Sequence, residues 1–166
     1  GALNALAFTT LTFYLLTGLF GARLGEIESF LPPAKESAAA DAGQTAKNGE
    51  LTWITNDYEA AIARAKSENK RIFVDYTGYT CTNCRWMEAN MFTKAEVRKE
   101  LEKFVRVRLY TDGEGEPYQG FQRMQEQRFG TVALPLYAIV TASDETVATF
   151  AGLTRDQNEY LAFLRK

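Results

Sequence analysis

The sequence predicts an α/β domain with a mixed central sheet and helices on both of its faces. Two segments rich in β-branched and aromatic residues, RIFVDYT (71–77) and FVRVRLY (104–110), are typical of strands and are separated by helical segments. Two further strand-like segments, LYAIVTA (136–142) and ETVATFAG (145–152), flank a Ser143-Asp144 turn and predict a hairpin. Parallel crossovers followed by an antiparallel hairpin give a mixed sheet.

The other predicted elements complete the order β-α-β-α-(α)-β-α-β-β-α. One is a short strand, and the others are helices recognised by their caps and their apolar faces. They are the strand LTWIT (51–55), the helix NDYEAAIARAKSENK (56–70) capped by Asn56 or Asp57, a helix running on from Arg85 to Asn90, TKAEVRKELEKF (93–104) with a Thr93–Glu96 capping box, EPYQGFQRMQEQRFG (116–130) closed by Gly130, and TRDQNEYLAFLRK (154–166).

The N-terminal segment has a different character. GALNALAFTTLTFYLLTGLF (1–20) carries no charge, and as a helix it is about 30 Å long, enough to cross a bilayer. We therefore predict a transmembrane helix over about residues 2–20, at the end of a membrane domain (1–30), with a buried helix of a soluble domain as the alternative. Residues 31–50 are small and polar after two prolines, which predicts a flexible linker before a domain at 51–166.

Composition excludes several kinds of chemistry. The 166-residue chain has a net charge of -2, two cysteines and no histidine. No basic stripe is present, so nucleic acid is not an expected partner. Two thiols without imidazole cannot complete a zinc site, CxxC without a following histidine does not attach haem, and a Cys-His nucleophile is impossible. We expect neither a metal nor a cofactor.

The two cysteines are placed for redox chemistry. Cys81 and Cys84 lie between a predicted strand and a predicted helix, so Cys81 is expected at the helix N-terminus. Unpaired amides and the helix dipole favour a thiolate there, and Cys84 follows one turn later on the same face. This predicts Cys81 as the attacking thiol and Cys84 as the resolving thiol. A purely structural short-loop disulfide remains the alternative.

Two acids and two arginines near these elements also require an interpretation. Asp75 shares a strand face with Phe73, which predicts a buried carboxylate. Glu88 follows Cys84 by one helical turn, and this spacing fits a residue of the redox site and an ordinary surface glutamate equally well. Arg106 and Arg108 alternate with valines, which predicts the solvated face of a strand.

The segments VDYTGYTCTNCRWME (74–88) and ALPLY (133–137) resemble the thioredoxin superfamily, and specifically the C-terminal thioredoxin-like domain of the DsbD family of transmembrane thiol:disulfide interchange proteins. LLTGLFGARLGEIESFLPP (15–33) is similar to the end of that family's membrane domain. The resemblance implies a thioredoxin-like fold. The Thr82-Asn83 dipeptide departs from the Gly-Pro of ordinary thioredoxin.

The resemblance also implies the residues of the site. It assigns catalytic roles to the two thiols and the two flanking carboxylates, Cys81, Cys84, Asp75 and Glu88. It maps the superfamily's cis-proline to Pro135, beside which the exposed backbone of Leu134 can pair with an extended partner segment. The expected partner-binding residues are Leu134, Pro135, Thr82 and Asn83.

The function implied by the resemblance is an electron relay. A membrane-embedded cysteine pair in the membrane domain of the same protein is the expected electron donor, and an oxidised extracytoplasmic thiol-disulfide protein or N-terminal domain is the expected acceptor. The implied location is the bacterial inner membrane, with the thioredoxin-like domain on the periplasmic side. The alternative is a non-catalytic, membrane-tethered binding module of the same fold, held by a structural disulfide.

Overall fold

The computed structural model describes residues 1–19 and 51–166, so the linker predicted over 31–50 lies outside the described residues. Helix α1 (Ala2–Leu19) forms as predicted. The hydroxyls of Thr9, Thr10 and Thr12 donate to carbonyls one turn back on the same helix, as in Thr9 Oγ1 to Ala5 O at 2.6 Å. Among the described residues, no helix is both long and apolar enough to span a bilayer. The predicted transmembrane helix is therefore not supported.

A five-stranded mixed sheet forms the centre of the domain, in the order β1-β3-β2-β4-β5. The two pairings among the first three strands are parallel, and the two pairings made by β4 are antiparallel. This confirms the predicted crossovers and the predicted hairpin. The strands are β1 (Ile54–Thr55), β2 (Ile72–Thr77), β3 (Val105–Tyr110), β4 (Leu136–Val140) and β5 (Thr146–Ala151).

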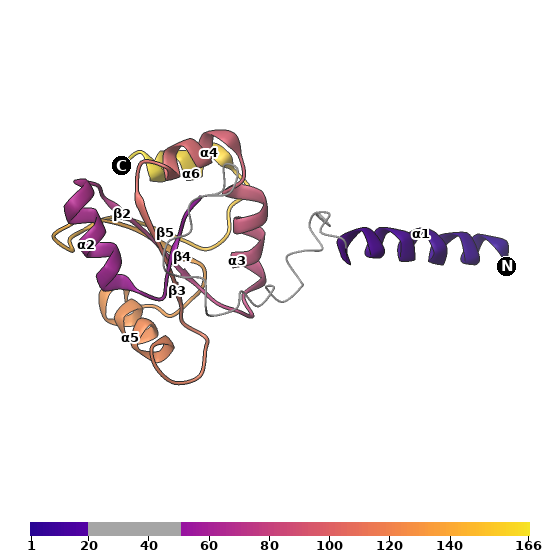
Figure 1. Cartoon of the computed structure of the whole chain (residues 1–166), viewed down its shortest axis with the longest axis horizontal. Helices are drawn as coiled ribbons and strands as arrows, with labels where there is room; N and C mark the ends of the chain where they lie inside the picture. Colours follow the sequence, from indigo (N-terminus) through magenta and orange to yellow (C-terminus); the bar gives the residue numbers. More distant parts are fainter. Residues whose placement is uncertain (20–50) are drawn as a thin grey trace.

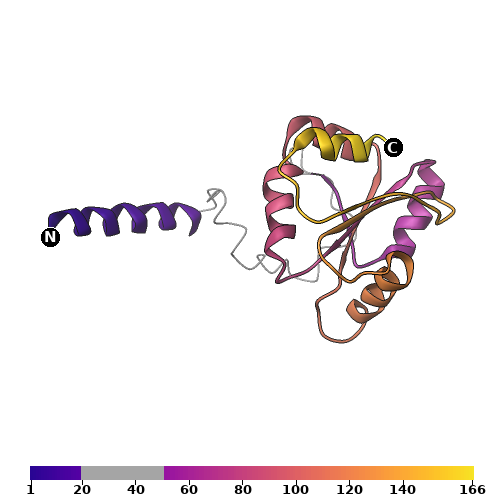
Figure 2. The same ribbon diagram turned by 180° about the vertical axis from the view of Figure 1, so that it is seen from behind.

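Helices cover both faces of this sheet (Figures 1 and 2). Two of them, α2 (Tyr58–Glu68) and α5 (Tyr118–Phe129), pack on one face. The other face is covered by α3 (Thr82–Trp86), a π-helical turn η2 (Met87–Met91) that continues it, α4 (Ala95–Leu101) and α6 (Gln157–Leu164). In both views α4 and α6 lie side by side.

Strand β2 is buried along its whole length because both of its faces are covered. Ile72, Val74 and Tyr76 point into the core beneath α2 and α5, whereas Phe73 points into the aromatic core beneath α4 and α6. Since side chains alternate along a strand, Asp75 shares the face of Phe73. The prediction of a buried Asp75 is confirmed, because this residue is 0% exposed.

The predicted solvated face of β3 is wrong. The Arg106 side chain is partly buried and donates hydrogen bonds to the carbonyls of Thr52, Leu101 and Phe104 at 2.7–3.0 Å. The Arg108 side chain is only 19% exposed and stacks over the Trp53 ring at 4.5 Å. Arg106 contacts the end of α4 and the Thr52 segment, and Arg108 contacts Glu88 in η2. The alternation with valines therefore separates two covered faces of the strand.

Candidate redox site

The two cysteines form a disulfide at the start of helix α3, as the strand-CxxC-helix pattern predicts. Cys81 is the N-cap residue of α3, and its sulfur accepts a hydrogen bond from the Cys84 amide at 3.2 Å. The two Cα atoms are 5.3 Å apart across the bond. Cys81 is half-buried, whereas Cys84 is 1% exposed. Within the pair, Cys81 is therefore the sulfur that a partner can reach.

The loop that leads into Cys81 is held by Asp112, a residue just after β3. Its carboxylate accepts hydrogen bonds from the amides of Tyr79 and Thr80 at 2.7 and 2.9 Å, and from the Thr80 hydroxyl at 2.8 Å. A Cβ on Gly78 would lie 2.7 Å from this carboxylate, so a larger residue there would force one of the two groups to shift. Asp112 thus fixes the backbone immediately before the reactive cysteine.

A cluster of two carboxylates and two guanidiniums lies on the same face of the sheet as helix α3. The β2–β3 register sets Asp75 beside Arg108, which approaches Asp75 Oδ2 at 3.3 Å and Glu88 Oε1 at 3.7 Å. Glu88 also pairs with Arg85, the residue after Cys84, at 2.9 Å. The two predicted catalytic acids are therefore joined through one shared cation, Arg108.

Burial governs the ionisation of Asp75. Removal from water raises the pKa of Asp75 to about 7, the Arg108 guanidinium opposes that rise, and the Glu88 charge adds to it. Asp75 Oδ1 is buried with no hydrogen-bond partner among the described residues. This carboxyl therefore exchanges its proton near neutral pH, a range in which an ordinary aspartate is fully ionised.

Arg85 joins this cluster to the loop before Cys81. It donates a hydrogen bond to the Gly78 carbonyl at 3.1 Å, and its guanidinium lies 5.9 Å from the centroid of the Tyr110 ring. Tyr79 stacks on Tyr110 with ring centroids 4.0 Å apart and remains 40% exposed. Tyr79 thus forms an exposed rim beside the disulfide, whereas Tyr76 belongs to the core.

The predicted cis-proline is confirmed, since the Leu134–Pro135 bond is cis. Leu134 Cδ1 lies 3.0 Å from the position that a Cβ on Gly78 would take, which sets this loop beside the loop preceding Cys81. Thr82 and Asn83 are exposed at the start of α3. The partner-binding roles of these residues stay predictions, and so do the catalytic roles of the acids.

Sequence reasoning missed three residues of this region: Arg85, Arg108 and Asp112. Only Arg85 had a local signal, because an arginine three residues before a glutamate on a helix predicts an ion pair. Arg108 meets Asp75, and Asp112 meets Tyr79 and Thr80, across more than 30 positions of sequence. Those contacts depend on the strand register, which the sequence pattern did not specify.

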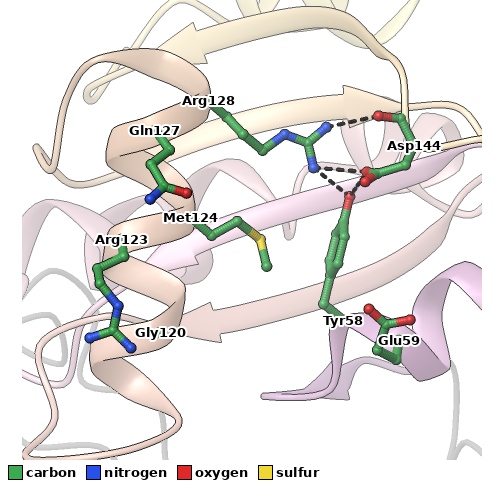
Figure 3. Close-up of a pocket in the computed structure, with 8 residues that line it drawn as sticks. All are labelled: Tyr58, Glu59, Gly120, Arg123, Met124, Gln127, Arg128 and Asp144. Carbon is green, nitrogen blue, oxygen red and sulfur yellow. Dashed lines mark hydrogen bonds and ion pairs between the residues drawn. The ribbon is translucent and has the colours of Figure 1, made fainter.

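A second hollow on the surface lies away from the disulfide, between the start of α2, helix α5 and the turn that joins β4 to β5 (Figure 3). Three of its polar side chains, Tyr58, Arg128 and Asp144, are paired with one another. Arg128 donates to Asp144 at 2.8 Å and to the Tyr58 hydroxyl at 2.9 Å, and that hydroxyl donates to Asp144 at 2.5 Å. Burial raises the pKa of Tyr58 to about 12. We interpret these contacts as a clasp that ties three elements together.

The mixed sheet and the disulfide at the start of α3 together define a thioredoxin-like fold. A family model described as thioredoxin-like matches residues 53–142, which is more than half of the chain. The chain therefore belongs to the thioredoxin-like family. No curated protein matches the sequence.

Several solved structures share this fold. A thioredoxin from Thermus thermophilus is 24% identical with a TM-score of 0.56, over 69% of this chain and 85% of that chain. A DsbH oxidoreductase is 15% identical with a TM-score of 0.54, over 80% and 99% of the two chains. The reduced DsbD c-terminal domain of Neisseria meningitidis is 16% identical with a TM-score of 0.52, over 67% and 97%. At these identities the likeness shows the fold alone.

Proposed function

We propose that this chain is a thiol-disulfide oxidoreductase that reduces an oxidised protein partner through Cys81 and Cys84. The observation that carries the proposal is the asymmetry of the pair, in which a half-buried Cys81 caps a helix and a buried Cys84 lies one turn inside it. Helix N-termini favour the thiolate that thiol-disulfide exchange requires. Structures of the same fold that are named thioredoxin and DsbH oxidoreductase support the assignment.

The exchange proceeds in two balanced steps. The Cys81 thiolate attacks one sulfur of the partner disulfide, forms a mixed disulfide and releases the partner's other sulfur as a thiolate. The Cys84 thiolate then attacks the Cys81 sulfur, which closes the Cys81–Cys84 disulfide and releases the second partner thiol. Two electrons pass to the partner, and two protons leave the dithiol for the two partner thiols. Asp75, with a pKa of about 7, supplies a group that accepts or returns a proton at neutral pH.

We further propose the electron relay that the sequence resemblance implies. In this scheme a membrane-embedded dithiol of a DsbD-like membrane domain reduces the Cys81–Cys84 disulfide. The acceptor is an oxidised thiol-disulfide protein or domain on the extracytoplasmic, periplasmic side of a bacterial inner membrane. The support is the resemblance of residues 74–88 and of the segment around Leu134-Pro135.

Trapping of the mixed disulfide tests the reaction and the order of the thiols. Cys84→Ser removes the resolving thiol, so we expect it to accumulate mixed disulfides with an oxidised partner protein on a non-reducing gel. Cys81→Ser should accumulate none. Accumulation with Cys81→Ser instead would reverse the assignment.

A redox titration distinguishes the enzyme from a structural disulfide. We expect equilibration with a glutathione or dithiothreitol series to give a reduction potential above about -300 mV. A lower potential would favour the binding module held by a structural disulfide.

A further inference from the structure

Helix α5 carries a polar side chain that the proposed reaction does not use. Gln125 is 0% exposed and belongs to the face of α5 that packs against the sheet. Helix α5 ends at Gly130, which adopts a left-handed conformation with φ 68° and reverses the chain. Residues 131–134 therefore run back past the last turns of the helix, toward the cis-proline.

Two side chains hold the backbone of Ala133 in this returning segment. Gln125 Nε2 donates a hydrogen bond to the Ala133 carbonyl at 2.9 Å. The Thr131 hydroxyl accepts a hydrogen bond from the Ala133 amide at 3.1 Å. After the proline, the Pro135 carbonyl accepts from the Gly152 amide at 2.8 Å. The backbone is thus held on both sides of Leu134.

The backbone of Leu134 itself is not held in this way. Within residues 1–19 and 51–166, neither its amide nor its carbonyl makes a hydrogen bond, although its side chain lies beside Gly78 in the loop before Cys81. An extended partner segment that pairs with Leu134 needs these two groups at a fixed distance and angle from the Cys81 sulfur. Any rotation of the Ala133–Leu134 peptide would change this distance and this angle.

We propose that Gln125 is a positioning residue that fixes the Ala133 carbonyl and thereby orients the Leu134 backbone for protein substrates. This inference rests on the proposed function. Gln125 is poorly suited to core packing alone, because its Oε1 atom is buried with no hydrogen-bond partner among the described residues. Burying an unpaired amide oxygen costs stability that an apolar side chain of similar size avoids. Its Nε2 contact with Ala133 gives the glutamine a role that methionine cannot fill.

Substrate size separates this role from a general effect on the fold. In the full chain, Gln125→Met keeps the side-chain length and removes the bond to Ala133. Gln127→Met, at an exposed position on the same helix, is the matched control. The first measurement is reduction of insulin, driven by dithiothreitol. The second is single-turnover reduction of bis(2-hydroxyethyl) disulfide, which has no peptide backbone to pair with Leu134.

We expect Gln125→Met to raise KM for insulin about five- to tenfold, the effect of losing one ordered hydrogen bond, with kcat within about twofold of the wild-type value. The rate with bis(2-hydroxyethyl) disulfide should stay within about twofold, because attack by Cys81 on a small disulfide does not use Leu134. Gln127→Met should leave both rates unchanged.

Three outcomes would overturn the inference. The first is an insulin KM in Gln125→Met that matches the Gln127→Met control. The second is an equal loss with both disulfides, which would indicate damage to the dithiol. If Gln125→Met does not fold, Thr131→Val is tested in its place, because it removes the acceptor of the Ala133 amide. An unchanged insulin KM in Thr131→Val would be the third outcome. A wild-type chain that reduces the small disulfide but not insulin would refute the proposed function as well.

Discussion

Arg108 connects the two acids of the site, so its removal is the most informative perturbation of the cluster. Arg108→Met keeps a long apolar stem and removes the guanidinium that Asp75 and Glu88 share. Asp75 is then left 1% exposed without a cation beside it. We expect the variant to unfold at a markedly lower urea concentration than the wild type.

The magnitude follows from distance and burial. At an effective dielectric constant of about 20, unit charges at the separations seen for Arg108 attract by roughly 4–5 kcal/mol per pair. The desolvation of the guanidinium offsets much of this attraction. Removing one partner of a buried pair typically costs about 3–5 kcal/mol, because the other charge stays buried and uncompensated. We expect a loss of about that size at pH 8.

The loss should shrink as the pH falls. Burial already raises the folded-state pKa of Asp75 from 3.8 to about 7, so the folded protein binds a proton that the unfolded chain releases between these values. Stability from this group therefore decreases as the pH rises from about 4 to 7. Without Arg108 the pKa of Asp75 rises further, and the decrease continues above pH 7. The variant should come closest to the wild type near pH 5, where Asp75 is neutral in both proteins.

Urea denaturation of the oxidised proteins at pH 5 and pH 8 measures both effects without titrating thiols. The matched control is Arg98→Met. Arg98 lies 3.3 Å from Glu102, the same separation as between Arg108 and Asp75, but these side chains are 35% and 55% exposed. We expect the control to lose less than about 1 kcal/mol. An Arg108→Met variant no less stable than Arg98→Met at pH 8 would refute the reasoning, and so would an equal loss at both pH values.

Three other predictions concern the surroundings of the disulfide and the clasp. Glu88→Gln leaves the guanidiniums of Arg85 and Arg108 with less compensating charge, so reduced Cys81 should become alkylated at lower pH. An unchanged or higher midpoint in pH-dependent alkylation would contradict a role of Glu88 in setting the thiol pKa. Gly78→Ala places a Cβ 2.7 Å from the Asp112 carboxylate, which should displace it and cost about 1–3 kcal/mol in urea denaturation, whereas a neutral result would show that the loop adapts. Tyr58→Phe removes the hydroxyl from the clasp and should cost about 1–2 kcal/mol with no change in redox potential; a shifted potential would contradict the separation of the two regions.

The fold was predictable because its signals are local. Strand composition, helix caps and the hairpin turn gave the order of elements and the mixed sheet, and each signal spans fewer than about 15 residues. One cap was misplaced even so. Thr93 was expected to cap α4, but Lys94 is the N-cap residue and the Thr93 hydroxyl bonds to the Ala89 carbonyl. Ala89 belongs to the π-helical turn that precedes α4, so this turn binds the hydroxyl that the capping box would have used.

The site was predictable only in part, for the same physical reason. Cys81 and Cys84 lie one turn apart at the start of a helix, so their spacing could identify them, and alternation along the strand predicted the burial of Asp75. The catalytic role of Asp75 was implied only by the family resemblance. The alternation of Arg108 with valines would look the same in a strand with one exposed face and in a strand covered on both faces. The difference depends on how many layers the chain builds, which is a property of the assembled domain.

A chain without histidine still contains a group that titrates near neutral pH, and the cluster explains how. An exposed aspartate would be ionised throughout the neutral range, and an isolated buried one would be protonated throughout it. Asp75 lies between these limits for two reasons. Burial on the sheet face that it shares with Phe73 raises its pKa, and Arg108, which the strand register sets beside it, limits that rise. The same guanidinium holds Glu88 on the helix that carries the cysteines. Proton exchange at the proposed site therefore depends on the β2–β3 register as much as on the CxxC sequence itself.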